Sequence, residues 1–438
     1  MKQPITVHPD AHPITVALVG AGHRTAEYAR YALDHPDRMQ AVAIAEPDEL
    51  RRRKLAEAHA IPHDRRFASY QDLVARDRIA NAAINGTMDE LHHASTMALI
   101  ESGYHVLLEK PIAQQQRHVR ELINASEQHG VTVMICHVLR YAPFYQAIRD
   151  LIDKGAIGPI IAMTSNENVS YHHMAAAFIR GRWRRRETNP ILLAKCSHDL
   201  DLIAWFNSGV RAERVASFGC LSQFKPENAP PGSTPRCLDG CVIERTCPYS
   251  ARINYIEQDL WGAYAWESIE HIDHPTVKDK LVSLRTDNPF GRCVWHCDND
   301  VVDHQTVIVS FANGVTATHN MFCGTARPTR TMHIVGERGE IEGDLEAGRI
   351  EVRTPDMAIV GSENAYHIEV IDVNASGAGE QDGHGGGDGR LVADFVAIIA
   401  GEQPSGSVTH IQDSLTGHLI AFAADTAMQE SRVVELER

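Results

Sequence analysis

The sequence predicts an α/β protein with at least two domains, the first of them a doubly wound parallel sheet of the Rossmann type. A chain of 438 residues is longer than a single hydrophobic core usually serves. In its first third, short β-branched apolar runs alternate with helical patterns, and that alternation is typical of parallel βαβ units. Polar or glycine-containing motifs follow several of these runs, at the strand ends where such sheets bind ligands.

Composition and charge exclude several classes of protein. The net charge is −15, which does not suit nucleic acid or an anionic membrane surface as a partner. The N-terminus has no apolar signal segment and no run of 18 apolar residues occurs, so we expect neither export nor a membrane span. The nine cysteines then indicate reduced thiols or a metal site in a cytoplasmic protein, and not a disulfide framework.

The first strand and helix enclose a dinucleotide-binding turn. Residues 14–19 form an apolar run, Gly20-Ala21-Gly22-His23-Arg24-Thr25 follows, and a helical pattern covers 26–33. Gly20 allows a tight turn, and Gly22 lets backbone amides approach a pyrophosphate at the helix N-terminus. Thr25 stands where the fingerprint has its third glycine, and that departure bears on helix–strand packing, not on phosphate binding.

The second strand supplies the acidic residue that selects NAD. Residues 39–45 are apolar and end at Glu46, 26 positions after Gly20, where a carboxylate accepts hydrogen bonds from the adenosine ribose. The same carboxylate repels a 2′-phosphate, so we predict NAD as the cofactor. The arginines at 51–53 are near enough to hold such a phosphate, but we favour a solvated helix face for them.

Further βα units complete the first domain and place two more motifs at strand ends. Asn85-Gly86-Thr87 follows one predicted strand, and Glu109-Lys110-Pro111 follows the next. The strands predicted in this domain cover 79–84, 104–108 and 131–135, and the helices cover 91–102 and 114–129. In the second half we predict strands over 158–170, 301–311, 315–321, 332–335, 340–342 and 349–352, and helices over 192–206, 391–399 and 414–430.

These motifs together resemble the glucose–fructose oxidoreductase / inositol dehydrogenase / MocA family. The resemblance rests on Gly20-x-Gly22, Glu46, Thr87-x4-His92 and Glu109-Lys110-Pro111, and continues through Arg140-Tyr141-x-Pro143 and Gly155-x-Ile157-Gly158. It implies a Rossmann domain over residues 1–140 and, over 141–438, an α+β substrate-binding and oligomerisation domain with an open, mainly antiparallel sheet. It also implies NAD, a carbohydrate substrate and a homo-oligomer, a dimer or a tetramer. The cofactor-binding residues that follow are Gly20, Gly22, His23, Arg24, Glu46, Thr87, His92, Glu109 and Lys110.

Catalysis is expected at Lys110 and on the apolar helix. In the family, the lysine of the EKP motif lies beside nicotinamide and substrate, and a partly desolvated lysine can exchange protons with a hydroxyl. Members commonly carry Asp-x3-His-x2-Asp at the start of the helix; His198 and Asp201 match, whereas Ala194 replaces the first aspartate. We therefore predict that His198 is the acid/base and that Lys195 orients the substrate hydroxyl.

The same helix allows a plainer interpretation. Lys195 and Asp199 are four residues apart, so they can form an ion pair on a solvated helix face. The apolar neighbours at 191–193 and 202–206 favour a buried, functional face.

A basic cluster precedes this helix. Five arginines occur among the seven residues 180–186. They suit an anionic sugar held by guanidinium groups, and equally suit charge pairing with acidic neighbours or at a subunit interface. The substrate-contacting residues that we predict are Tyr141, His173, Arg180, Arg182, Asp199 and, in the glycine-rich segment 377–389, His384.

An insert near residues 224–297 contains Cys237-x3-Cys241-x5-Cys247. Three closely spaced cysteines can hold structural zinc, with a fourth ligand from Cys293, His296 or Cys297. We favour reduced, buried thiols and assign no metal.

The expected activity is hydride transfer between NAD and a secondary hydroxyl of a sugar derivative, an anionic one if the arginines contact it. The alternative is an NAD-dependent glycoside hydrolase, as some relatives are. It oxidises the sugar at its third carbon, eliminates the aglycone, adds water and reduces the ketone again, which with an anionic sugar is a sulfoquinovosidase-like activity. A non-catalytic NAD-binding regulator is a third interpretation, against which the intact EKP motif and His198 argue.

Overall fold

The computed structural model describes residues 13–374 and 386–436 and contains two sheets. The first sheet is six-stranded and parallel throughout, in the order β3-β2-β1-β4-β5-β6. Its strands are β1 (Ile14–Val19), β2 (Met39–Ala45), β3 (Arg66–Phe67), β4 (Ala82–Asn85), β5 (His105–Leu108) and β6 (Val133–Ile135). The predicted doubly wound sheet is confirmed, and the order reverses between β1 and β4, where such folds bind a dinucleotide.

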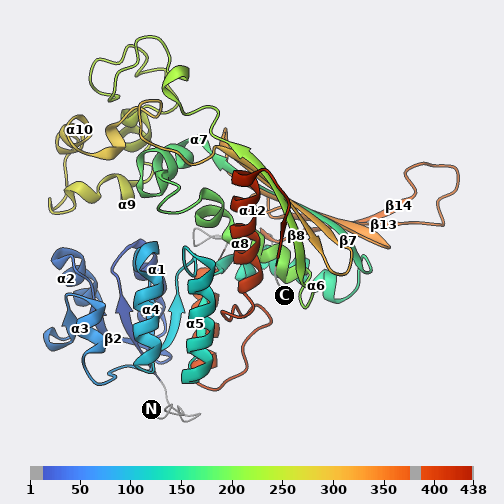
Figure 1. Ribbon diagram of the computed structural model, residues 1–438, viewed down its shortest axis with the longest axis horizontal. Helices are drawn as coiled ribbons and strands as arrows, with labels where there is room; N and C mark the ends of the chain where they lie inside the picture. The colour runs from blue at the N-terminus through green and yellow to red at the C-terminus, as the bar shows by residue number, and fades with distance from the viewer. Residues whose placement is uncertain (1–12, 375–385, 437–438) are drawn as a thin grey trace.

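Helices cover both faces of this sheet (Figure 1). They are α1 (His23–Asp34), α2 (Glu49–Ala58), α3 (Tyr70–Val74), α4 (His92–Glu101) and α5 (Gln116–His129). The strands are buried on both sides because one apolar core lies under α1 and another under α3, α4 and α5. Because all six strands are parallel, their carboxyl ends lie at one edge of the sheet, together with the N-termini of the helices that follow them.

The second sheet is nine-stranded and mainly antiparallel, in the order β14-β13-β12-β11-β7-β10-β9-β8-β15. Only the β7–β10 pair is parallel among the described strands of this sheet. The strands are β7 (Ile160–Ser170), β8 (Ala212–Cys220), β9 (His304–Phe311), β10 (Thr316–Thr325), β11 (Thr329–Gly336), β12 (Gly339–Asp344), β13 (Arg349–Pro355), β14 (Tyr366–Asp372) and β15 (Val434–Glu435). The open antiparallel sheet expected from the family is thus confirmed, and β13 and β14 extend from it as an arm (Figure 1).

One face of this sheet is covered and the other is not. Helices α6 (Pro143–Asp153), α7 (Tyr171–His173), α8 (Ile191–Phe206) and α12 (Leu415–Glu430) belong to the covered side. Side chains that alternate with the buried ones point outward, and Phe218, Ile308 and Phe322 are exposed apolar residues on three neighbouring strands.

The chain returns to the first domain near its end. Helix α11 (Asp388–Ile399) packs on α1, and Leu391 and Phe395 join the core under it. Residues next to Thr409 then extend the first sheet, because the Ile135 amide donates to the Thr409 carbonyl (2.9 Å) and the Ile411 amide donates to the Val133 carbonyl (3.0 Å). The domain predicted for residues 1–140 therefore takes part of its structure from beyond residue 387.

The insert predicted near residues 224–297 lies between β8 and β9 and forms a separate lobe. It contains α9 (Gly262–Ala265) and α10 (Val277–Arg285), with a small core that includes Tyr255 and Phe290. Figure 1 shows this lobe, yellow-green to gold, above α2 of the first domain. An ion pair of 2.5 Å between Arg51 and Glu270 ties the two together. No helix in the described part of the chain is long and apolar enough to cross a membrane.

Candidate active site

The turn after β1 has the shape that a pyrophosphate requires. Gly20 has φ +87°, and a Cβ there would lie 2.7 Å from the carbonyl oxygen of Gly86. A Cβ on Gly22 would meet nothing within 4 Å, so the backbone is open on that side. Gly22 is the N-cap of α1, whose first amides receive no side-chain cap among the described residues. Amides at a helix N-terminus that face open space fit the pyrophosphate of a dinucleotide.

Thr25 takes the place of the third glycine without loosening the turn. Its side chain is fully buried, and a Cβ on Gly86 would lie 2.3 Å from its hydroxyl oxygen. The space that the fingerprint usually gains from a glycine on α1 is here provided by Gly86, which follows β4.

Glu46 lies at the end of β2 beside this turn. Its carboxylate accepts hydrogen bonds from the amides of Ala21 (2.7 Å) and Asp48 (2.8 Å). Arg51 is paired with Glu270, and Arg52 donates to the carbonyl oxygens of Glu46 and Pro47. Two of the three nearby arginines are thus held by the protein, and the Glu46 carboxylate lies at the strand end where dinucleotide-binding folds bind the adenosine ribose.

Two of the predicted cofactor-binding residues, Arg24 and His92, are held by other groups of the protein. The Arg24 guanidinium pairs with Glu109 (3.0 Å) and with Asp388 of α11. His92 is buried, with its ring nitrogens 2.6 Å from the carbonyl oxygen of Pro111 and 3.1 Å from that of Thr87. Arg24 and His92 therefore join loops and helices of the first domain to one another. His23 lies at the start of α1, its ring centroid 6.3 Å from that of Tyr264 in the insert.

Lys110 joins the two domains at the EKP motif. Its ammonium donates a 2.7 Å hydrogen bond to the carbonyl oxygen of Ala194, in the first turns of α8. Burial lowers the pKa of Lys110, against the opposing charges of Glu109 and Asp89. A lysine with a lowered pKa, fixed beside the helix that carries His198, is suited to proton exchange.

Lys195 lies in a buried network of charges and not on a solvated face. Its ammonium pairs with Glu167 of β7 at 3.0 Å. Arg330 of β11 pairs with Glu167 at 2.6 Å and with Asp199 at 3.1 Å. Burial alone would raise the pKa of the Glu167 carboxyl, but Arg330 and Lys195 outweigh it and hold that pKa below its ordinary value. Asp199 is thus the partner of Arg330, and the alternative Lys195–Asp199 pair is not formed.

His198 stands at one end of a row of buried histidines. It is 5% exposed, and its ring centroid lies 5.5 Å from that of His137, which lies 5.5 Å from that of His418. His418 of α12 accepts from the Ile112 amide (3.0 Å), and its other nitrogen lies 3.0 Å from the Ser414 carbonyl oxygen. That geometry fixes one neutral tautomer. Burial and the neighbouring His137 lower the pKa of His418 to about 3.

His137 and His418 are residues that sequence reasoning missed. His137 follows β6 at the carboxyl edge of the sheet, and that position is the signal that could have identified it. His418 gave none, because its helix reaches the site only through the tertiary fold. Asp201, which matches the last residue of the family pattern, is held by Arg140 through two 2.6 Å bonds.

His173 borders this network from the insert side. Its ring centroid lies 4.4 Å from that of Trp261. Burial lowers the pKa of His173 well below its ordinary value, and Lys195 and Arg330 add to that effect. The predicted substrate residue His173 is therefore close to the predicted catalytic residue Lys195.

Comparison with known proteins decides the family. Residues 14–137 match the model of the Gfo/Idh/MocA oxidoreductase family with its NAD-binding Rossmann fold, and residues 149–436 match the C-terminal α/β domain of that family. The chain belongs to the Gfo/Idh/MocA family. It is an NAD-binding oxidoreductase, and the resemblance, the fold and the cofactor predicted from the sequence are confirmed.

The similar proteins include enzymes whose names refer to sugars or sugar nucleotides. The protein YteT of Bacillus subtilis (strain 168) is 24% identical over 324 residues, which are 72% of this chain and 71% of that protein. The 1,5-anhydro-D-fructose reductase of Ensifer adhaerens is 33% identical over 152 residues, 34% of this chain and 44% of the reductase. The WlbA dehydrogenase of Bordetella pertussis, solved with NADH and UDP-GlcNAcA, has a TM-score of 0.67 at 17% identity over 99% of this chain and 100% of that one.

The basic cluster of this Gfo/Idh/MocA protein does not surround the site as one group. Arg182 pairs with Glu267 (2.6 Å), and Arg184, Arg185 and Arg186 pair with Asp298, Asp300 and Asp425. Arg180 is fully buried and donates to groups of the insert. Four of the arginines are therefore paired with acidic neighbours, as in the second interpretation, and an anionic substrate stays a prediction.

Two further predicted substrate residues are not found at the site. Tyr141 is buried in the core between the first sheet and α11. His384 lies outside the residues that the structure describes.

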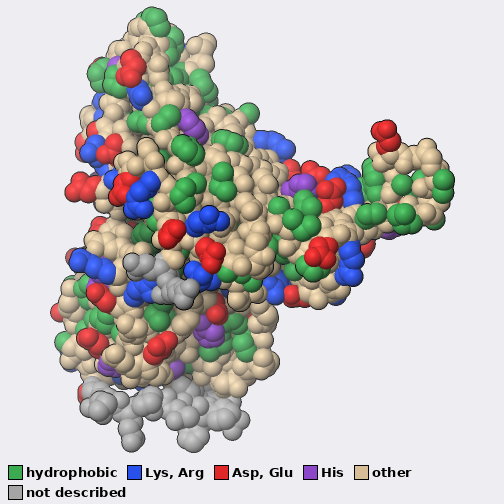
Figure 2. Space-filling model, turned by 45° about the vertical axis from the view of Figure 1, so that its right-hand side comes forward, with side chains coloured by type: hydrophobic (Ala, Val, Ile, Leu, Met, Phe, Trp, Pro, Cys, Tyr) green, Lys and Arg blue, Asp and Glu red, His purple; other side chains and the backbone are tan. Residues whose placement is uncertain are grey.

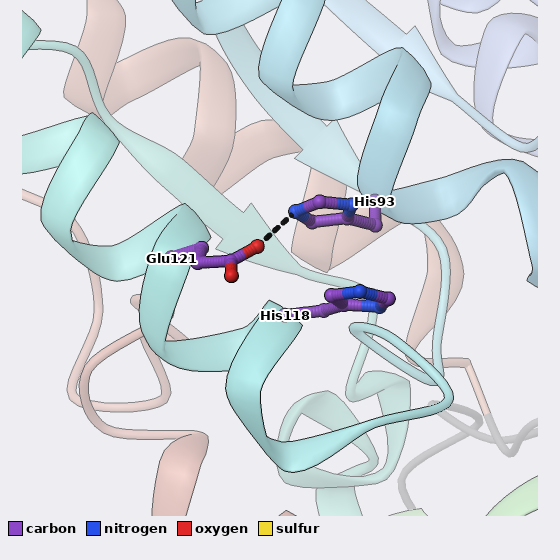
Figure 3. A group of neighbouring side chains, drawn as sticks. All are labelled: His93, His118 and Glu121. Carbon is purple, nitrogen blue, oxygen red and sulfur yellow. Dashed lines mark ion pairs between the residues drawn. The ribbon is translucent and has the colours of Figure 1, made fainter.

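One group of metal-ligating types lies away from the site, on the outer surface of the family's first domain. Figure 3 shows His93 on α4 facing His118 and Glu121 on α5. His93 lies 2.7 Å from the Glu121 carboxylate, and the two histidine rings stack at 4.0 Å. These three side chains thus satisfy one another by an ion pair and ring stacking, and we assign no metal to them.

Proposed function

We propose that this oxidoreductase transfers hydride between NAD and a carbon that bears a secondary hydroxyl of a sugar or sugar derivative. The observation that carries the proposal is the contact of Lys110 with Ala194, because it brings the EKP lysine onto the helix of Lys195 and His198. The names of the Ensifer reductase and the UDP-GlcNAcA complex of WlbA support a carbohydrate substrate.

The residues divide the work between proton transfer and positioning. The turn of Gly20 and Gly22 would hold NAD, which would supply the acceptor or donor of the hydride. His198 takes the proton of the hydroxyl, since an imidazole is suited to proton transfer near neutral pH. Lys195 and Lys110 hold the substrate oxygen and stabilise the negative charge that develops on it. Glu167 and Arg330 fix Lys195 in place, so its ammonium needs no reorganisation during the reaction.

We also propose a cytoplasmic location and a homo-oligomeric assembly. All nine cysteines are free, which supports the reducing environment of the cytoplasm. The exposed apolar row on the second sheet supports a homo-oligomer formed through that face. We propose a carbohydrate as the substrate, and the paired arginines do not require that it be anionic.

The test is a turnover assay with a panel of neutral sugars, acidic sugars and aryl glycosides at catalytic NAD⁺. We expect NADH to rise in proportion to added sugar and NAD⁺, and Lys110→Met and His198→Ala to abolish the rise. Release of the aryl group over many turnovers without net NADH would assign the redox-cycling hydrolase instead. Absence of both would contradict the proposal.

A further inference from the structure

Four cysteines of the insert line one small, enclosed cavity. They are Cys237, Cys241, Cys247 and Cys293, and the cavity volume is about 10 Å³, close to the least that holds one water molecule. The sequence pattern supplied the first three, and the fold selects Cys293 in preference to His296 or Cys297 as the fourth.

The backbone brings the two ends of the insert together at these cysteines. Arg236 and Arg292 form a β-bridge. Cys237 donates its amide hydrogen to Gly291 (3.0 Å), and Cys293 donates its own to Pro235 (2.9 Å). Cys237 and Cys293 are thereby held side by side although 56 positions separate them, while Cys241 and Cys247 follow on the loop. Paired cysteines on a tight backbone frame, completed by a distant ligand, suit a structural metal.

A buried arginine at the same cavity lacks an acidic partner. Arg180 is 0% exposed and lines the cavity. Its guanidinium donates to the carbonyl oxygens of Arg292 (2.7 Å) and Tyr249 (2.7 Å), to the Tyr255 hydroxyl (2.9 Å) and to the Cys237 sulfur (3.4 Å). No carboxylate within residues 13–374 and 386–436 pairs with it. A buried charge without an opposite charge is costly, and thiolates bound to a metal supply the missing negative charge.

We propose that Cys237, Cys241, Cys247 and Cys293 bind a thiophilic metal centre, a zinc ion or an iron–sulfur cluster, that fixes the insert. Four sulfur ligands are characteristic of these two centres. Among the described residues, no three of these sulfur atoms come within 4.8 Å of one another. A single zinc ion, with Zn–S distances of about 2.3 Å, draws the sulfurs inward, whereas an iron–sulfur cluster requires the cavity to widen.

The thiols become ligands only as thiolates. Binding displaces the protons into solvent, and the metal–sulfur bonds replace the S–H bonds without any change of sulfur oxidation state.

The centre acts on the active site through the insert that it holds. The insert carries Trp261, whose ring contacts that of His173, and Glu270, which pairs with Arg51 beside the cofactor turn. A metal that closes the base of this lobe fixes both contacts, so its role is structural and not catalytic.

The experiment is metal analysis of the full-length protein purified without added metal or chelator, with and without exclusion of air. We expect either about one zinc per chain, or iron with matching acid-labile sulfide and visible absorption. Cys293→Ser and Cys237→Ser should lose most of the metal. Cys297→Ser, a nearby thiol that does not line the cavity, should keep it.

A second measurement is independent of whether the variants fold. Chelation of the wild-type protein should expose the 224–297 lobe to limited proteolysis while the Rossmann domain stays protected. Wild-type protein that contains neither zinc nor iron, or variants that keep the full metal content, would overturn the proposal. Failure of the sugar assay alone would leave it standing, since the metal content is measured without turnover.

Discussion

The ammonium of Lys110 donates a hydrogen bond to the carbonyl oxygen of Ala194, 2.7 Å away. Ala194 stands four residues before His198, so the same carbonyl is the helical acceptor for the amide of His198. The EKP loop of the first domain is thus fixed to the turn of α8 that presents His198, the acid/base residue that we propose. Motion of one domain relative to the other would change the distance from Lys110 to the reacting hydroxyl.

Replacing Lys110 should remove activity and leave the fold intact. In Lys110→Met, Ala194 keeps its helical partner and no buried ammonium has to be desolvated. We expect kcat to fall by about 10²–10⁴-fold with little change in the melting temperature. Steady-state kinetics and thermal unfolding measure the two effects. Lys154→Met is the matched control, because Lys154 is an exposed lysine that follows α6 directly; equal losses in both variants would refute the assignment.

Replacing Lys195 should chiefly lower activity, whereas replacing Arg330 should chiefly lower the free energy of unfolding. Lys195→Met leaves Glu167 paired with Arg330, so we expect chiefly a loss of kcat. Arg330→Met leaves the buried carboxylates of Glu167 and Asp199 with Lys195 as their main counter-charge. Breaking a buried pair in this way costs about 3–5 kcal/mol of unfolding free energy. Denaturant titration of both variants tests this order, and the opposite order would show that Lys195 is the structural cation.

Glu46 should decide the choice of coenzyme. Its carboxylate lies beside the turn, and Arg51 and Arg52 are already bound by protein groups. Repulsion of a 2′-phosphate by a nearby carboxylate amounts to roughly 1–4 kcal/mol. We therefore expect kcat/KM to favour NAD over NADP by at least about tenfold, which is about 1.4 kcal/mol, and Glu46→Ser to narrow that ratio. An unchanged ratio in the variant would place the selectivity elsewhere.

Sequence patterns predicted those parts of the site that depend on local order. The Gly20 turn, Glu46 and the EKP motif each follow an apolar strand, and a parallel sheet brings all such strand ends to one edge. The buried face of α8 was also predictable, because the apolar residues around Lys195 leave little room for solvent. The nine-stranded sheet needed the family resemblance, since pairing between distant strands leaves no local signal.

Tertiary partners are what the sequence could not specify. Lys195 meets Glu167 on β7, and Asp199 meets Arg330 on β11, through contacts that no spacing encodes. The guanidinium of Arg180 is a group suited to binding an anionic substrate, yet the side chain is buried and donates to groups of the insert. Helix α11 returns to the first domain because its apolar face completes the core beside α1, which a boundary drawn at residue 140 does not anticipate.

Buried neutral histidines should make the protein less stable in mild acid. His418 has a pKa of about 3 in the folded protein and about 6.5 when unfolded. Between these values the unfolded chain binds a proton that the native chain does not, so stability rises with pH and falls as pH decreases from 6.5. One such histidine contributes about 1.4 kcal/mol per pH unit. Denaturant unfolding at several pH values should give a shallower slope for His418→Gln than for wild type; an equal slope would show that His418 charges in the native state.

The outer face of the second sheet should mediate self-association. Phe218 is 72% exposed in the single chain, and Ile308 and Phe322 lie on the same face of the two next strands, β9 and β10. Figure 2 shows that apolar side chains also gather on the projecting β13–β14 arm. Large apolar side chains that are exposed on one sheet face are often covered by a partner in solution, and a second copy of the chain presents the same sheet face in a symmetric contact.

Phe218→Glu places charges on both sides of such a contact. We expect light scattering after size exclusion to report a dimer or tetramer for wild type and a smaller species for Phe218→Glu. Val277→Glu, which adds the same charge at an exposed apolar position of the insert, should keep the wild-type mass. A wild-type monomer, or a Phe218→Glu protein of unchanged mass, would show that this face is not the interface.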